Sequence, residues 1–266
     1  MPDASTLMKG LLLVIVAAVL VAFVPLLFGD QPLKVVSIGD SVTYDADPGI
    51  RAALEATGAV TVNTRSIGGV GLLRPGIDDY LNDVLVGDPD VVVVMLGGWD
   101  LGEIVADPSA YGTRLNDVAN QLTADGAHLV WLSMPPTPPG EKIEDARRLA
   151  NRLFVQLAER RSDVDHIATG IILGDPAGAF IRFRTGVDGR LVQIRKVRND
   201  RDDGHLCSGG AALLGQAVLE VVGSRFALPE AVSGWWQDSW TDDPRYDDPP
   251  GGCGAVVVSS SINKPD

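Results

Sequence analysis

Short apolar stretches alternate with amphipathic stretches along the chain from residue 33 to residue 222. The apolar stretches are rich in Val and Ile, as parallel strands buried on both faces are. They predict strands at Leu33–Ile38, Val60–Ile67, Asp90–Leu96, Ala127–Ser133 and Asp163–Thr169. The amphipathic stretches predict helices at Pro48–Thr57, Ser109–Asp125, Lys142–Arg161 and Ala211–Val222. This alternation predicts an α/β fold with a central parallel sheet that is covered by helices on both faces.

Two segments depart from this alternation. Phe180–Thr185 and Arg190–Lys196 alternate apolar with polar residues around Val187-Asp188-Gly189. Asp-Gly accepts the positive φ angles of a tight turn, so this segment is predicted to form a hairpin. Residues 227–266 have no period and are rich in Pro, Trp and Asp, so we expect an extension that lies on the domain. The extension contains three tryptophans: Trp235, Trp236 and Trp240. They either pin the extension to the domain or offer ring faces on which sugars can stack.

An apolar stretch of eighteen residues, Leu11–Phe28, precedes the first predicted strand. As a helix it would span about 27 Å, close to the bilayer core of about 30 Å. We therefore expect one transmembrane helix at 11–28, with 1–10 in the cytoplasm and everything after residue 30 outside it, because Lys9 lies before the stretch. A cleaved signal peptide is the alternative, but the stretch is long for one and no small-x-small cleavage site follows it.

Composition limits the class of partner. The chain has 266 residues, enough for one domain, 31–226, together with the anchor and the extension. Its 35 acidic and 22 basic residues give a net charge of −13, which argues against nucleic acid or a bare anionic membrane surface as the main partner. One basic run is either plain surface charge or a site that attracts an anionic polymer: Arg195, Lys196, Arg198 and Arg201.

A serine stands at the end of the first predicted strand, in Gly39-Asp40-Ser41. At such a junction a hydroxyl lies at the carboxyl edge of the sheet, and its own N–H lies at a helix N-terminus, where developing negative charge is favoured. A histidine that could activate this serine lies in Asp202-Asp203-Gly204-His205, before the last helix. The spacing of Asp202 from His205 allows a short turn in which the carboxylate fixes one imidazole nitrogen, and the other is free to take the proton of Ser41.

Gly39-Asp40-Ser41 followed by Asp202-x-x-His205 resembles the GDSL/SGNH hydrolase family, over roughly Leu33 to Val222. The resemblance implies a flavodoxin-like three-layer α/β/α sandwich and the chemistry of esterases and acyl-transferring enzymes. It also implies a Ser-His-Asp triad of Ser41, His205 and Asp202.

The same resemblance implies an oxyanion hole formed by Ser41, by a glycine after the second strand and by an asparagine after the third. Gly69 is the best match for the glycine, and Gly71 is the second candidate. Trp99 stands in place of the asparagine. The indole N–H of Trp99 is itself a donor, and a tryptophan here is similar to exported bacterial domains that accompany membrane sugar O-acyltransferases. Asp40, Gly71 and Asp100 adjoin these positions and are predicted to contact substrate.

The remaining polar residues suggest no cofactor. No Cys/His cluster has metal-ligand spacing and no Gly-rich phosphate loop follows a strand, so we expect neither a metal nor a cofactor. His128 and His166 are expected to be ordinary surface or edge histidines. Cys207 and Cys253 are expected to form a disulfide, because an even count in an exported chain fits an oxidising compartment; two unpaired thiols are the alternative.

Together these patterns predict an exported, membrane-tethered serine esterase or acyltransferase that acts on O-acyl esters, with cell-envelope carbohydrate as the expected substrate. Within the enzyme class, a lipid esterase or thioesterase is the alternative. From a different class, the alternative is a catalytically weak scaffold that binds glycan or a membrane acyltransferase partner.

Overall fold

The structure is a computed structural model, and it describes residues 31–254. The predicted transmembrane helix at Leu11–Phe28 and the end of the extension, 255–266, lie outside the described residues. Within 31–254, no helix combines the length and the apolar character that crossing a bilayer requires.

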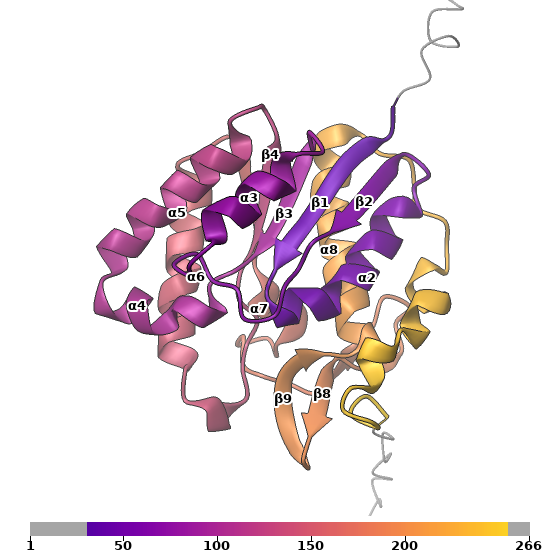
Figure 1. Cartoon of the computed structure of the whole chain (residues 1–266). Coiled ribbons are helices and arrows are strands. Elements are labelled where there is room, and N and C mark those ends of the chain that lie inside the picture. The colour runs from indigo at the N-terminus through magenta and orange to yellow at the C-terminus, as the bar shows by residue number, and fades with distance from the viewer. Residues whose placement is uncertain (1–30, 255–266) are drawn as a thin grey trace, which may run out of the picture. The chain divides into compact units, whose positions relative to one another are not determined.

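Five parallel strands form one sheet in the order β2-β1-β3-β4-β5 (Figure 1). The strands are β1 (Leu33–Gly39), β2 (Val60–Thr64), β3 (Val91–Met95), β4 (His128–Leu132) and β5 (Val164–Ile167). This is the flavodoxin-like order, in which ligands bind at the carboxyl edge where the connections diverge on either side of the first strand. The predicted central parallel sheet is confirmed, and the residue that follows β1 lies at that divergence.

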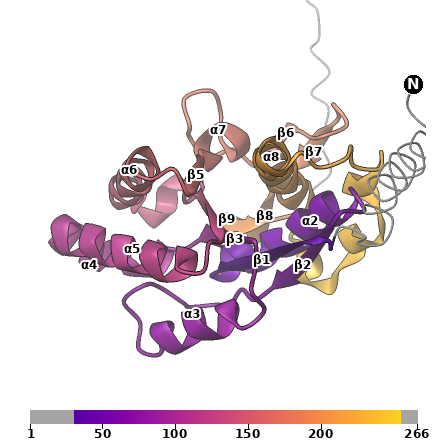
Figure 2. The same cartoon turned by 90° about the horizontal axis from the view of Figure 1, so that it is seen from above.

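Helices cover both faces of the sheet, because side chains along each strand alternate between two apolar layers. Val36 and Ile38 of β1 belong to one layer and Val35 to the other. The first layer includes residues of α3 (Ile77–Leu85), α4 (Leu101–Ala106), α5 (Pro108–Thr123) and α6 (Glu144–Glu159). The second includes residues of α2 (Ser41–Glu55), α7 (Thr169–Leu173) and α8 (Ser208–Phe226). Figure 2 shows α3 and α8 on opposite sides of the sheet.

Helix α2 begins at Ser41, seven residues before the start that the sequence predicts. The Asp40 side chain caps it by accepting a hydrogen bond from the Val42 N–H at 2.9 Å. Pro48 lies inside the helix, where a proline removes the hydrogen bond to the carbonyl four residues earlier. Arg245 donates to that carbonyl, Tyr44 O, and thereby replaces the missing bond. The extension therefore supplies a partner for the helix carbonyl that Pro48 leaves free.

Two hairpins follow the sheet where the sequence predicts one. The expected hairpin is present in shorter form, as β6 (Phe183–Thr185) and β7 (Leu191–Gln193). The second hairpin consists of β8 (Arg195–Arg198) and β9 (Arg201–Leu206). Its turn residues, Asn199 and Asp200, have φ angles of 50° and 59°, as the tight turns that connect hairpin strands require.

The extension packs on α2 and α8 as far as residue 254. It contains three short 3-10 helices: η3 (Trp235–Gln237), η4 (Ser239–Asp242) and η5 (Pro244–Asp247). Trp235 is buried in a small apolar cluster with Ala53 of α2 and Ala212 of α8. Trp240 donates its indole N–H to the Trp235 carbonyl at 2.5 Å. Trp235 therefore pins the extension to the domain and has no face free for a sugar.

A disulfide joins Cys207, the cap of α8, to Cys253 in the extension. Next to it, the Gly252 carbonyl accepts hydrogen bonds from Val197 N–H at 2.9 Å and from the Gln193 amide at 2.8 Å. The end of the extension is thus tied both to the β8–β9 hairpin and to the start of α8.

Replacing Cys253 with serine is expected to lower the free energy of unfolding by up to about 4 kcal/mol, because the cross-link closes a loop of 46 residues. Urea unfolding of Cys253→Ser and Cys207→Ser should give the same loss, since either variant removes the same bond. Two titratable thiols in the denatured, unreduced wild-type protein would contradict the disulfide.

Candidate active site

Ser41 occupies the junction between β1 and α2, at the carboxyl edge of the sheet. Its side chain is partly exposed, and its N–H is one of the first four of the helix, which the helix itself leaves without a partner. The turn before it needs a glycine, because a Cβ on Gly39 would lie 2.6 Å from the Met95 carbonyl and closer still to Thr43. The tight packing of this turn therefore fixes the position of Ser41 relative to the end of β1.

His205 approaches Ser41 from strand β9. Its Nε2 lies 3.0 Å from Ser41 Oγ, and its Nδ1 lies 2.6 Å from Asp203 Oδ1. Because a carboxylate can only accept, the Nδ1 proton is held by Asp203 and the Nε2 lone pair is left for the serine proton. Asp203 also accepts from the His205 backbone N–H at 2.9 Å and from Arg198 Nε at 2.8 Å. The three side chains form a hydrogen-bonded series from serine to carboxylate.

The prediction that Asp202 partners His205 is wrong in the structure. It assumes a turn, but residues 201–206 form a strand, in which alternate side chains point to the same side. Asp203 therefore shares a side with His205, whereas Asp202 points away and pairs with Arg182 Nε at 2.7 Å. The pair Asn199-Asp200, whose residue types tolerate the positive φ angles of a tight turn, is the signal that could have identified this hairpin.

The electrostatics of the pair suit a general base. Burial favours a raised pKa for Asp203, but the hydrogen bonds from His205 and Arg198 outweigh it and hold the pKa well below its usual range. The hydrogen bond to Asp203 raises the pKa of His205 above its ordinary value of 6.5, against the opposing effect of burial. Asp203 therefore stays ionised at neutral pH, and a carboxylate in this position would stabilise a protonated His205.

This pKa shift predicts the pH dependence of any reaction that uses His205 as a base. Only neutral imidazole accepts the Ser41 proton, so kcat/KM should fall as the pH drops through the pKa of His205. Since that pKa is raised, the midpoint of the acid limb is expected above 6.5. The measurement is a kcat/KM profile with a neutral ester, and a midpoint below 6 would contradict the arrangement.

Two loops from neighbouring strands flank Ser41. A Cβ on Gly68 would lie 3.9 Å from Ser41 Cβ, so the loop after β2 passes the serine, and Gly69 has a φ of 84°. A Cβ on Gly98 would lie 3.0 Å from Asp40 Oδ2, which places the loop after β3 beside the same turn. Both segments that were expected to provide oxyanion donors therefore lie near Ser41. Which N–H groups act as donors stays a prediction.

Trp99 follows Gly98 and is 48% exposed. The guanidinium of Arg74 lies over its ring, 5.7 Å from the centroid, and the Arg74 Nη2 donates to the Trp99 carbonyl at 3.1 Å. The structure thus shows an exposed indole that is paired with an arginine near the turn. A hydrogen bond from its N–H to a substrate stays a prediction.

The three residues predicted to contact substrate have structural roles. Asp40 is the helix cap, and burial raises its pKa. Asp100 is 1% exposed and accepts from Leu72 N–H at 2.6 Å and Tyr111 Oη at 3.2 Å. A Cβ on Gly71 would lie 2.4 Å from the Asp100 carboxylate. Asp100 and Gly71 therefore brace the loop after β2 from within, and a contact of any of the three residues with substrate stays a prediction.

Half of the basic run before the histidine is internal, because Arg195 and Lys196 are buried, whereas Arg198 and Arg201 are exposed. Whether the exposed pair attracts an anionic polymer stays a prediction. Arg195 is fully buried and donates to Gly204 O at 2.5 Å and Pro136 O at 3.0 Å. Lys196 is 3% exposed, and Arg198 binds Asp203. These side chains hold the hairpin in place.

The other two histidines are not simple surface residues. His128 is 6% exposed, and its Nε2 lies 2.7 Å from Asp165 Oδ2 on the next strand. His166 Nε2 lies 2.7 Å from the Oγ of Ser133, which is buried. Burial lowers the pKa of His166. Neither histidine contacts Ser41.

A polar hollow of about 520 Å³ adjoins Asp203 and is called here the Glu141 hollow. It is lined by Glu141, Arg198, Asn199, Arg201, Asp202 and Asp203. Burial and the nearby Asp203 raise the pKa of Glu141. The hollow therefore places charged and hydrogen-bonding groups next to Asp203, the carboxylate that binds His205.

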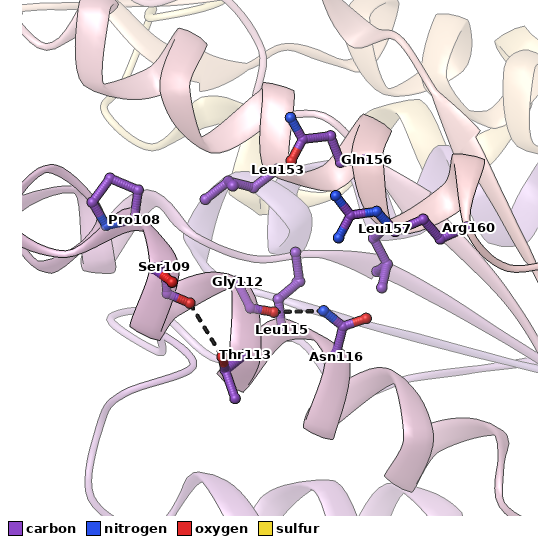
Figure 3. A pocket seen from close by; sticks show the side chains of 10 residues that line it. All are labelled: Pro108, Ser109, Gly112, Thr113, Leu115, Asn116, Leu153, Gln156, Leu157 and Arg160. Atoms are coloured by element: carbon purple, nitrogen blue, oxygen red, sulfur yellow. Dashed lines mark hydrogen bonds between the residues drawn. The ribbon is translucent and has the colours of Figure 1, made fainter.

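A second pocket, of about 300 Å³, lies between α5 and α6 and shares no residue with the Ser41–His205–Asp203 series (Figure 3). Two of its polar side chains bond to carbonyls of their own helix: Thr113 Oγ1 donates to Ser109 O, and the Asn116 amide donates to Gly112 O. Across residues 31–254, no group of three or more His, Cys, Asp or Glu side chains is arranged to hold a metal ion.

The sheet order, the serine after β1 and the histidine just before the last helix are those of the GDSL/SGNH hydrolase fold. Solved structures share it. A protein from Desulfitobacterium hafniense assigned to the G-D-S-L lipolytic family is 15% identical, with a TM-score of 0.55 over 71% of this chain and 99% of that chain. A lipase/acylhydrolase from Enterococcus faecalis is 16% identical, with a TM-score of 0.54 over 72% of this chain and 96% of that chain.

The chain belongs to the family described as "Protein of unknown function (DUF459)", whose model matches residues 34–221. No curated protein matches the sequence. At the identities above, the solved structures establish the fold, and the activity has to be argued from the site.

Proposed function

We propose that the protein is a serine esterase or acyltransferase in which Ser41, His205 and Asp203 form the catalytic triad. The observation that carries the proposal is the continuous hydrogen bonding from Ser41 Oγ through His205 to Asp203 at the divergence point of the sheet. The relatives of the same fold described above are lipolytic proteins and acylhydrolases, and the proposed chemistry is of that kind.

The reaction has two halves. Ser41 Oγ attacks the ester carbonyl carbon while His205 Nε2 takes the hydroxyl proton, and the N–H groups of Ser41 and Gly69 receive the oxyanion. His205 then gives the proton to the departing alcohol, which leaves an acyl group on Ser41. In the second half, water or a sugar hydroxyl attacks the acyl-enzyme with His205 again as the base, which releases an acid or a new ester.

A carbohydrate ester is the substrate that the surroundings favour over a lipid. The Glu141 hollow is lined by charged and polar side chains, which can hydrogen-bond the hydroxyl groups of a sugar. The exposed ring of Trp99 adds a face on which a sugar can stack. In this proposal the glycan lies across the hollow and the ester group reaches Ser41.

We also propose that the domain acts outside the cytoplasm and is tethered by residues 11–28. The apolar stretch Leu11–Phe28 and the disulfide between Cys207 and Cys253 support this location. A reporter that works only outside the cytoplasm, fused after Asp266, should be active, and activity of a cytoplasmic reporter alone would refute the orientation.

Labelling with a fluorophosphonate tests the proposed activity, because only an activated serine reacts. Wild-type protein should be labelled at Ser41, and Ser41→Ala should not be labelled. Ser133→Ala is the matched control: Ser133 also contacts a histidine, at 2.7 Å, but its side chain is buried, so its loss should leave the labelling unchanged. A folded wild-type protein that neither reacts with the probe nor hydrolyses any of several esters would instead favour the scaffold that binds glycan or a membrane acyltransferase.

Variants of Trp99 distinguish two roles for this side chain, which stands where an oxyanion-hole asparagine is expected: a hydrogen-bond donor to the oxyanion, or a ring on which a sugar stacks. If the indole N–H donates to the oxyanion, Trp99→Phe should lower kcat by roughly ten-fold or more with KM nearly unchanged. If the ring stacks on sugar, Trp99→Phe should have little effect, and Trp99→Ala should raise KM for a glycan ester. Steady-state kinetics on both variants make the distinction. If neither constant changes in either variant, Trp99 has no part in the reaction.

A further inference from the structure

Asp45 joins the helix of the serine to the hairpin of the histidine. It lies four residues, about one turn, after Ser41 on α2 and is 2% exposed. Its Oδ2 accepts a hydrogen bond from the Leu206 N–H at 3.0 Å, directly after His205. Its Oδ1 lies 3.1 Å from the Nζ of Lys196 on β8. One carboxylate therefore contacts both strands of the hairpin that carries His205.

Other polar contacts of the hairpin lead elsewhere. Arg195 connects it to the loop at Pro136, and the disulfide connects the residue after β9 to the extension. Within residues 31–254, the polar contacts between α2 and the β8–β9 hairpin are the Ser41–His205 pair and the two contacts of Asp45. Asp45 is thus the fixed connection between the two elements whose separation sets the Ser41–His205 distance.

The contribution of the buried Asp45–Lys196 pair to stability gives little reason for its presence. A buried ion pair loses much of its attraction to desolvation, and well-packed apolar residues often stabilise a fold as well or better. What a buried pair does give is a defined geometry, provided that its remaining hydrogen-bonding groups are satisfied. Here two further hydrogen bonds hold the pair: Lys196 also donates to Arg245 O at 2.7 Å, and Tyr246 Oη donates to the backbone carbonyl of Asp45 at 2.9 Å.

We propose that Asp45 is a positioning residue for the catalytic pair: through Leu206 N–H and Lys196 it holds His205 Nε2 within hydrogen-bonding distance of Ser41 Oγ. The inference rests on the proposed function, because it concerns the efficiency of that reaction. A misplacement of about 1 Å in such a site can cost about 10² in rate. The cost should fall on kcat, since Asp45 is buried and touches no substrate.

The test compares two variants that break the connection with one that does not. Asp45→Asn keeps the size of the side chain, but its NH₂ group cannot accept a hydrogen bond, so either Leu206 N–H or Lys196 Nζ loses its acceptor. Lys196→Met removes the ammonium group. Asp47→Asn is the matched control: Asp47 is 3% exposed on the same helix and binds Ser37 Oγ of β1 at 2.7 Å, away from the hairpin. Burial raises the pKa of Asp47 to about 7, so the neutral amide resembles a form already present at neutral pH.

The measurements are kcat and KM on a small acyl ester, the fluorophosphonate labelling rate and hydrogen exchange of the Leu206 amide, all below the unfolding temperature of each variant. We expect Asp45→Asn and Lys196→Met to lower kcat and the labelling rate by 10- to 100-fold, with KM within about three-fold and faster exchange at Leu206. Asp47→Asn should keep kcat within about two-fold.

Wild-type kcat in both folded variants would overturn the inference and leave the proposed function intact. A loss of the same size in Asp47→Asn, or failure of both hairpin variants to fold, would also overturn it, because the effect would then be general stability. No turnover and no labelling in the wild type would refute the proposed function, and the inference with it.

Discussion

Replacing Ser41 or His205 with alanine is expected to remove nearly all turnover of a small acetyl ester and to leave the fold intact. Both side chains are only partly buried, so their loss creates no core cavity. Because nucleophile and base act as one unit, each single variant should lose about as much as the double variant, on the order of 10⁴- to 10⁶-fold in kcat. Esterase assays on purified variants, with circular dichroism as the check on folding, provide the measurement.

Ser133→Ala and His166→Ala are the matched controls for this pair. They remove a second serine–histidine contact of similar length that lies at the same edge of the sheet. Turnover in these controls should stay within a few-fold of wild type as long as they remain folded. Wild-type turnover in Ser41→Ala would rule out the whole mechanism.

The second large effect is expected at Asp203. Asp203→Asn places an amide against His205 Nδ1, which favours the tautomer whose Nε2 already carries a proton and cannot accept one from Ser41. A change of this kind in a serine protease triad costs about 10⁴ in kcat, and we expect roughly 10³- to 10⁴-fold here. The comparison variant is Asp202→Asn, which removes only a partly exposed ion pair with Arg182.

On a small acetyl ester, which does not reach the Glu141 hollow that Asp202 lines, Asp202→Asn should keep kcat within about three-fold of wild type. The two variants change neighbouring residues in the same way, so a difference between them reports on His205 and not on the charge of the hairpin. The opposite result, a large loss at Asp202 and little at Asp203, would show that the turn predicted from the sequence forms in the working enzyme.

The sequence predicts the fold well because parallel α/β folds carry strong local signals. Val91–Met95 is apolar throughout and buried on both faces, and a short stretch of this kind is typical of a central parallel strand. The start of α2 is harder to predict, because Pro48 suggests a helix N-terminus and the side chain that compensates for it, Arg245, lies 197 positions away. A contact over that distance has no local pattern.

The site is predictable to the extent that its residues lie at the ends of predicted elements. Ser41 follows a buried strand and His205 precedes a helix, and the structure brings both together. Asp202 and Asp203 cannot be distinguished by composition, since the choice depends on whether residues 201–206 form a turn or a strand. Asp45 is harder still to recognise, because nothing in its local sequence marks a buried partner 151 positions away.

The tie between Cys207 and Cys253 also has a consequence for the order in which the protein is made. Synthesis proceeds from the N-terminus, so Ser41, Asp203 and His205 are all present before the extension that braces the hairpin exists. Cys253 is added 48 residues after His205, and the bond cannot close before then. A chain synthesised only as far as His205 thus contains all three side chains of the proposed triad and still lacks the cross-link that follows β9, so the hairpin is braced only after the extension has been added.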